Sequence, residues 1–112
     1  MRSDADRFAD MLGAAGKISS ATNVGIEVFL ADEMLQVWVI HHLQLIGEAA
    51  RAVSAPLRER YPEVPWGQII ALRNILVHEY FGLNLRQVFE TTKQDLPDLE
   101  RQLRRIKAEL SD

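Results

Sequence analysis

The stretch "DEMLQVWVIHHLQLIGEAARAV", residues 32–53, decides the fold. Its apolar side chains recur with the 3.6-residue period of an α-helix, and Asp32 is a suitable N-cap. The apolar stripe consists of Met34, Leu35, Trp38, Val39, His42, Leu45, Ile46, Ala49 and Val53. The stripe is broad enough to cover two sides of the helix. Because one neighbouring helix cannot cover both sides, this helix is expected at the centre of a bundle or shared with another subunit.

Four further segments show helical periodicity. They run from Asp4 to about Ile18, from about Trp66 to Tyr80, from about Leu85 to Thr92, and from about Leu96 to Leu110. The stretches "GKISSATNVG" (16–25) and "RERYPEVPWG" (58–67) are expected to be connections, and "IEVFLADE" (26–33) to hold one helical turn. Gly82 is expected to end its helix in a left-handed conformation. The sequence therefore predicts an all-α protein, an antiparallel bundle of four to five helices in a single domain over residues 1–112.

Composition limits the classes of function. The chain has 112 residues, a net charge of −3 and no cysteine, which excludes disulfide scaffolds and thiol nucleophiles. Residues 1–56 hold four Lys/Arg against seven Asp/Glu, and residues 57–112 hold nine of each, so a polyanion site would have to be a local patch. The acidic start "MRSDADRFAD" lacks the apolar run of a signal peptide, and no segment suits a bilayer. A cytoplasmic protein without a membrane partner is expected.

The stretch "RNILVHEYFG", residues 73–82, places charged and proton-handling side chains in an apolar helix. On that helix Arg73 and Tyr80 are seven residues apart and nearly superimposed, whereas Asn74 and His78 share the adjacent stripe. Arg73 and His78 point about 140° from each other, so they are expected to flank a groove rather than to pair.

This stretch, preceded by "YPEVPWGQIIAL", resembles the HEPN superfamily, specifically the HepT-like toxins that are partnered by a minimal nucleotidyltransferase antitoxin. The blocks "FLADEM", "LQLIGEAA", "LRERYPEVPW" and "VFETTKQDLPDL" extend the likeness over roughly residues 28–100. The resemblance implies a homodimeric, all-helical, metal-independent ribonuclease without a cofactor. It would be the toxin of a toxin–antitoxin pair, with RNA, and tRNA in particular, as the expected substrate.

The chemistry can also be argued from the residues. RNA cleavage without a metal needs groups that move protons at the 2′- and 5′-oxygens and a fixed cation for the charge on phosphate. His78 can move protons near neutral pH, and Arg73 can hold phosphate with its planar fork. A single histidine cannot serve both transfers, but a two-fold dimer supplies a second one. Asn74 is a candidate for orienting the imidazole or binding phosphate, and Tyr80 for binding phosphate or stacking on a base.

The resemblance implies a modification site at Tyr80, and several other residues have more than one candidate role. In the family the motif tyrosine, here Tyr80, receives AMP from ATP through the antitoxin, which would exclude RNA by charge and size. Arg51 is a candidate for guiding the RNA backbone. Glu48 could pair with Arg73 as a structural ion pair, which could also aim the arginine. His78 and Asn74 could instead form a polar pair in a core or interface.

Three further readings come from the remaining polar residues. His41 and His42 point about 100° apart and no chelating partner accompanies His78, so no metal site is expected. His42 is expected to be packed in the core and His41 to face a dimer cleft. The cations of the last helix alternate with acids, as on a solvated face.

Two rival functions remain open from the sequence. One is a non-catalytic module that binds a nucleotidyltransferase and positions its substrate, and the other is a plain dimerisation bundle.

Overall fold

The computed structural model describes residues 2–110, which are helical throughout apart from short connections and contain no strand. Residues 1, 111 and 112 of the predicted domain lie outside the described residues. The elements are α1 (Asp4–Ala21), α2 (Ile26–Ala31), α3 (Glu33–Ala52), α4 (Ala55–Arg60), α5 (Trp66–His78), the 3₁₀ turn η1 (Tyr80–Gly82), α6 (Leu85–Gln94) and α7 (Leu96–Leu110). The prediction of an all-α protein is confirmed.

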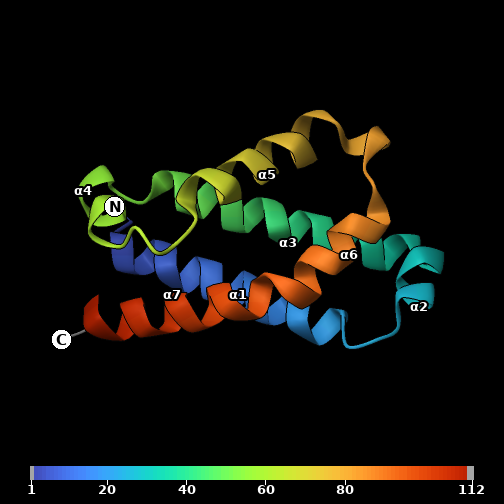
Figure 1. Ribbon diagram of the computed structural model, residues 1–112, viewed down its shortest axis with the longest axis horizontal. Coiled ribbons are helices and arrows are strands. Elements are labelled where there is room, and N and C mark those ends of the chain that lie inside the picture. Colours follow the sequence, from blue (N-terminus) through green and yellow to red (C-terminus); the bar gives the residue numbers. More distant parts are fainter. Residues whose placement is uncertain (1, 111–112) are drawn as a thin grey trace.

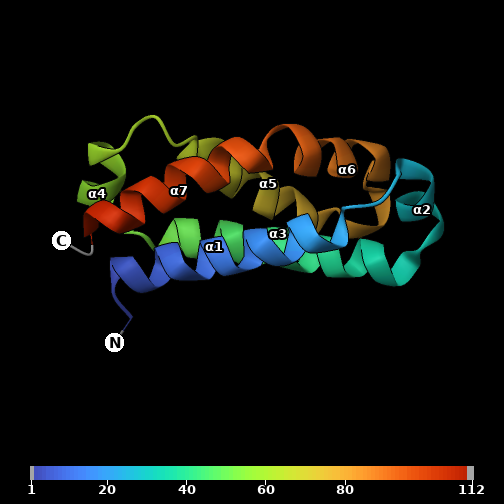
Figure 2. The same ribbon diagram turned by 90° about the horizontal axis from the view of Figure 1, so that it is seen from below.

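The long helices form an elongated bundle of 43 × 27 × 25 Å. Helix α3 packs against α1 on one side and α5 on the other, and α7 lies along α1 (Figure 1). Neighbouring long helices run antiparallel, and α2 and α6 meet at one end of the bundle (Figure 2). Helix α3 is therefore central, as its broad apolar stripe predicted. None of the helices within residues 2–110 is long and apolar enough to cross a membrane.

Side-chain caps explain why three of the helices begin where they do. The Ser3 hydroxyl accepts from the Asp6 N–H at 3.1 Å while the Asp6 carboxylate accepts from the Ser3 N–H at 2.9 Å, which is a capping box. These hydrogen bonds hold the pKa of the Asp6 carboxyl below its ordinary value. Asp32 accepts from the Leu35 N–H at 3.0 Å, so its predicted role as the N-cap of α3 is confirmed. Asn84 caps α6 in the same way.

Two predicted connections are partly helical, and the described residues form seven α-helices rather than four to five. Helix α1 continues to Ala21 because Ile18 is fully buried and tertiary packing outweighs the small, polar local sequence. Helix α4 forms where a break was expected, because Pro56 falls in its first turn, where proline is tolerated. Short helices hold too few residues for a period to be visible.

The end of α5 also differs from the prediction. The helix ends at His78, and the backbone of Glu79 leaves the helical region with φ −123° and ψ 32°. The Gly82 N–H donates to the Glu79 carbonyl at 3.0 Å and closes η1. No glycine within the described residues has a positive φ, so the left-handed cap expected at Gly82 is wrong. Tyr80 therefore does not continue the Arg73 stripe of α5.

The connection between α4 and α5 is tied to α7. The Tyr61 hydroxyl donates to the Glu109 carboxylate at 2.7 Å, and this hydrogen bond raises the pKa of Tyr61. The Gln102 amide donates to the Glu63 carbonyl at 3.2 Å, and Arg105 pairs with the Glu63 carboxylate. The start of α5 is thereby held beside α7, while its far end is free to present side chains.

Burial in the core predicts a contrast between two valines. Val39, on α3, is fully buried, whereas Val28, on α2, is 51% exposed. We expect Val39→Ala to lower the free energy of unfolding by about 2 kcal/mol, because two methyl groups are lost and a cavity remains. Val28→Ala should change it by less than about 0.5 kcal/mol. Urea denaturation followed by circular dichroism measures both, and equal effects would contradict this placement of the core.

Candidate active site

The candidate site lies where α5 crosses α3. Gly47 of α3 faces α5, and a Cβ built at Gly47 would overlap the Cβ and Cγ of Arg73 and lie 3.3 Å from the Ile69 carbonyl oxygen. The two helices therefore approach so closely that only glycine fits at this position. The motif reading did not single out Gly47, although an isolated glycine inside a strongly periodic helix is a recognisable signal of close packing.

Arg73 is held by two partners. One of its terminal nitrogens lies 3.5 Å from the Glu48 carboxylate, and the other donates to the Asn74 side-chain oxygen at 3.0 Å. The predicted pair of Arg73 with Glu48 is thus present. The Arg73 side chain is only 18% exposed and its Nε has no acceptor among the described residues. The Nε atom is buried and so is not itself open to a ligand; it is the charge of the guanidinium that can attract an anion.

His78 ends α5 and is exposed to solvent. Within residues 2–110 its side chain has no hydrogen bond or ion pair, so a polar pair with Asn74 in the core of one copy is wrong, and a pair in an interface stays a prediction. Asn74 instead orients Arg73. The structure therefore places a fixed cation and an unpartnered imidazole on one helix, five residues apart and on different sides, as the spacing predicted.

Tyr80 lies beyond the helix, in η1. Its ring is partly exposed and meets the ring of Phe81 edge to face at a centroid distance of 5.4 Å. In the described part of the chain its hydroxyl has no hydrogen-bond partner. The prediction that Tyr80 lies over Arg73 on one helix is therefore wrong, because such superposition needs an unbroken helix and α5 ends two residues before Tyr80.

The other candidate residues are spread over the bundle. Arg51 is exposed on the last turn of α3, one turn beyond Glu48. His42 is buried and its Nδ1–H donates to the Trp38 carbonyl at 2.7 Å, which confirms that it is a packed histidine. His41 is exposed beside it. The described residues contain no group of three or more His, Cys, Asp or Glu that could hold a metal ion.

The cations of α7 are mostly engaged with acids. Arg101 pairs with Asp98, Arg104 with Glu100, and Arg105 with Glu63. Pairs of this kind, largely exposed, are what a solvated helix face shows. These arginines of α7 therefore do not form a free cationic patch.

An uncovered apolar surface lies on the side of α3 that carries Glu48, the partner of Arg73. It consists of Met34, Val37, Trp38 and Leu45, and we call it the outer face. Met34 is 84% exposed and Trp38 is 46% exposed. The residues of α3 in this set follow one side of the helix toward Glu48. Contiguous exposed apolar side chains are typical of an interaction surface.

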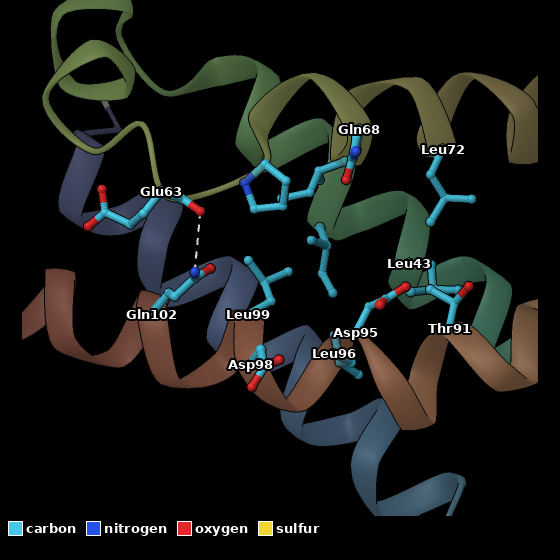
Figure 3. A pocket seen from close by; sticks show the side chains of 13 residues that line it. Leu43, Glu63, Gln68, Leu72, Thr91, Asp95, Leu96, Asp98, Leu99 and Gln102 are labelled. Carbon is cyan, nitrogen blue, oxygen red and sulfur yellow. Dashed lines mark hydrogen bonds between the residues drawn. The ribbon is translucent and has the colours of Figure 1, made fainter.

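A separate pocket of about 410 Å³ lies between α5 and α7, with α3 behind it (Figure 3). Its wall combines aliphatic side chains such as Leu43, Leu72 and Leu99 with the carboxylates of Asp95 and Asp98. No Lys, Arg or His is among the described residues that line it. Such a pocket does not suit a phosphate, and neither Arg73 nor His78 reaches it, so it is not part of the candidate site.

The fold and the site together describe a small helical bundle that carries a fixed arginine and an exposed histidine on one helix. The chain matches the family model described as "Ribonuclease HepT-like" over residues 11–106. The chain belongs to the HepT-like ribonuclease family, in agreement with the resemblance found in its sequence.

Curated relatives span most of the same length. A probable ribonuclease HepT of Thermococcus cleftensis is 33% identical over 107 residues, which cover 95% of this chain and 97% of the relative. An inferred RNase of Methanocaldococcus jannaschii is 34% identical over 84% of this chain and 87% of its own length. An inferred RNase of Caldanaerobacter subterraneus is 36% identical over 80% of each chain. No solved structure matches the chain.

The close contact at Gly47 predicts opposite effects for two glycine substitutions. Gly47→Ala would push α5 away and should lower the free energy of unfolding by about 1–3 kcal/mol. Gly13, in the middle of α1, has no atom within 4 Å of a built Cβ, so Gly13→Ala should stabilise by about 0.5–1 kcal/mol. Thermal and urea denaturation measure both. Stabilisation by Gly47→Ala would contradict the close packing of α5 on α3.

Proposed function

We propose that the protein is a cytoplasmic, metal-independent endoribonuclease, the toxin of a HEPN/nucleotidyltransferase toxin–antitoxin system. It cleaves RNA, with tRNA as the expected substrate, at a composite cleft between two copies of the chain. The observation that carries the proposal is the presence of a fixed arginine, Arg73, and an exposed, unpartnered His78 on the same helix of a chain in a ribonuclease family.

The reaction needs two proton transfers and charge stabilisation. The 2′-oxygen of RNA bonds to phosphorus as the bond from phosphorus to the 5′-oxygen breaks. One proton leaves the 2′-hydroxyl and another arrives on the 5′-oxygen, which imidazole groups can accept and donate near neutral pH. The guanidinium of Arg73, aimed by Glu48 and Asn74, binds the phosphate oxygens on which negative charge increases.

A homodimer supplies what one chain lacks. In a single copy His42 is buried in the core and the exposed His41 lies on α3, so His78 is the imidazole on the helix that carries Arg73. A two-fold axis beside the outer face would bury Met34 and Trp38 and bring a second His78 and a second Arg73 to one cleft. Two copies of Arg73 in one cleft also give a local positive charge that can attract RNA although the chain as a whole is acidic.

The antitoxin neutralises the toxin by modifying Tyr80. In the proposed reaction its hydroxyl oxygen attacks the α-phosphorus of ATP held by the antitoxin, forms a phosphodiester and releases pyrophosphate. The partly exposed ring and the hydroxyl without a protein partner support this role. The added AMP is bulky and anionic, and it would stand two residues from His78, where it repels the RNA backbone.

The first experiment is cleavage of bulk tRNA in EDTA. We expect the parent to cut with the chelator present and His78→Ala to lose about 10²-fold or more in rate, as for removal of a general acid or base. Arg101→Ala, which removes a cation paired with Asp98 on α7, serves as the matched control and should cut normally. Circular dichroism confirms equal folding.

Either of two results would contradict catalysis by His78. If the parent and His78→Ala cut equally, the activity lies elsewhere. If neither cuts, the non-catalytic module that binds a nucleotidyltransferase becomes the better account, and the outer face becomes its docking surface.

The composite cleft makes a prediction about assembly. Met34→Glu places a charge on the outer face at a side chain that is 84% exposed, so the fold of one copy should be unaffected. We expect it to shift the sedimentation coefficient from dimer to monomer and to lower cleavage, with activity recovering as protein concentration rises. Val28→Glu, on α2 outside the outer face, is the control. A parent chain that sediments as a monomer while cutting RNA at full rate would exclude the composite cleft.

A further inference from the structure

The exposed ring of Phe81 has no role in the chemistry above. Phe81 is 101% exposed, whereas the other three phenylalanines, Phe8, Phe29 and Phe89, are buried. A bare aromatic ring in water is costly, because burying such a side chain is worth about 1.5–3 kcal/mol. A small domain that buries every other phenylalanine therefore presents this one to something outside the chain.

We propose that Phe81 is a stacking platform for an unpaired nucleobase and directs cleavage to RNA segments that are not base-paired. The proposal rests on the ribonuclease function proposed above and adds a residue that selects the substrate. An unpaired base can leave its own stack and lie on a protein ring, whereas a base inside a duplex cannot.

The local geometry leaves room for a base. The edge-to-face contact with Tyr80, at an interplanar angle of 85°, can occupy only one face of the Phe81 ring, and the full exposure of Phe81 leaves the other face uncovered. Next in the chain, a Cβ built on Gly82 has no atom within 4 Å outside its two chain neighbours, so no other element crowds the backbone next to Phe81. The hydrogen bond that closes η1 fixes the backbone that carries the ring.

The ring also lies within reach of the proposed chemistry. Phe81 is three positions after His78, so their Cα atoms are at most about 11 Å apart. A base stacked on the ring would therefore bring its own nucleotide to the end of α5, near the exposed imidazole. Stacking is indifferent to base identity, so the expected preference is for unpaired over paired RNA rather than for one base.

The surroundings favour a base over a second protein surface. Protein interfaces bury aromatic anchors within a ring of other contacts. The neighbours of Phe81 along the chain are Tyr80, whose ring meets it edge to face, and Gly82, which has no side chain; beyond them lie the exposed polar Glu79 and the half-buried Leu83. The exposed aliphatic side chains that suit a second copy are instead on the outer face of α3.

Three substitutions of Phe81 in the full chain separate stacking from simple apolar contact. Phe81→Trp keeps an aromatic face, Phe81→Leu keeps apolar volume without one, and Phe81→Ala removes both. We expect KM for an unpaired RNA oligonucleotide to change less than two-fold in the Trp variant and to rise about 10-fold in the Leu and Ala variants. The preference for the unpaired oligonucleotide over the same sequence in a duplex should fall in the same two variants, with kcat at saturation little changed.

Two results of these assays would overturn the proposal, and a binding measurement decides it if the parent does not cut RNA. If Phe81→Leu matches the parent while Phe81→Ala loses activity and sediments as a monomer, the ring is buried by a second copy. If Phe81→Ala cuts like the parent, the ring has no part in substrate selection although the ribonuclease function stands. If the parent does not cut RNA, fluorescence anisotropy of a labelled unpaired RNA decides: about 10-fold weaker binding by Phe81→Ala supports stacking, and equal binding refutes it. Only the absence of cleavage by the parent bears on the proposed function itself.

Discussion

The close approach of α5 to α3 at Gly47 is the contact on which the candidate site depends. Without a side chain at that position, the backbone of α5 lies against α3 and the Arg73 side chain runs over the glycine toward Glu48. A larger residue would shift α5 and separate the arginine from the carboxylate and from its place beside the outer face. A residue without a functional group thus positions the one cation that the proposed chemistry needs.

The position of α3 explains why the site lies on the surface of such a small bundle. On its inner sides α3 buries Val39, Ile40, Ile46 and Ala50 against α1 and α5, while its outer side leaves Met34 and Trp38 exposed. The same helix therefore builds the core and offers an apolar surface. The broad apolar stripe of α3 reflects both its core side and its exposed apolar side, since a helix that packs only in the core would carry a narrower stripe.

The candidate site could be predicted in part. The separation of Arg73 from His78 follows from helical geometry, which holds as long as α5 is unbroken. The pair of Arg73 and Glu48, although expected, joins two helices and depends on how α5 packs on α3. The places of Asn74 and Tyr80 did not follow from helical spacing. Asn74 accepts from its neighbour Arg73 rather than pairing with His78, although the spacing favours His78, because the long arginine side chain reaches it. Tyr80 leaves the stripe because the helix ends at His78.

By itself the sequence determined the long helices, the caps at Asp32 and the family, because a periodic run of apolar residues and a capping side chain act locally and over many residues. Only the tertiary structure decided where α1 and α5 end and that residues 55–60 are helical. It also decided that Gly47 lies where α3 and α5 make close contact and that Phe81 is fully exposed. A helix end depends on one or two hydrogen bonds, whose net free energy of about 1 kcal/mol each is smaller than the packing of a single buried side chain such as Ile18. Such details follow from which elements meet in space, and the residues that meet are far apart in the chain.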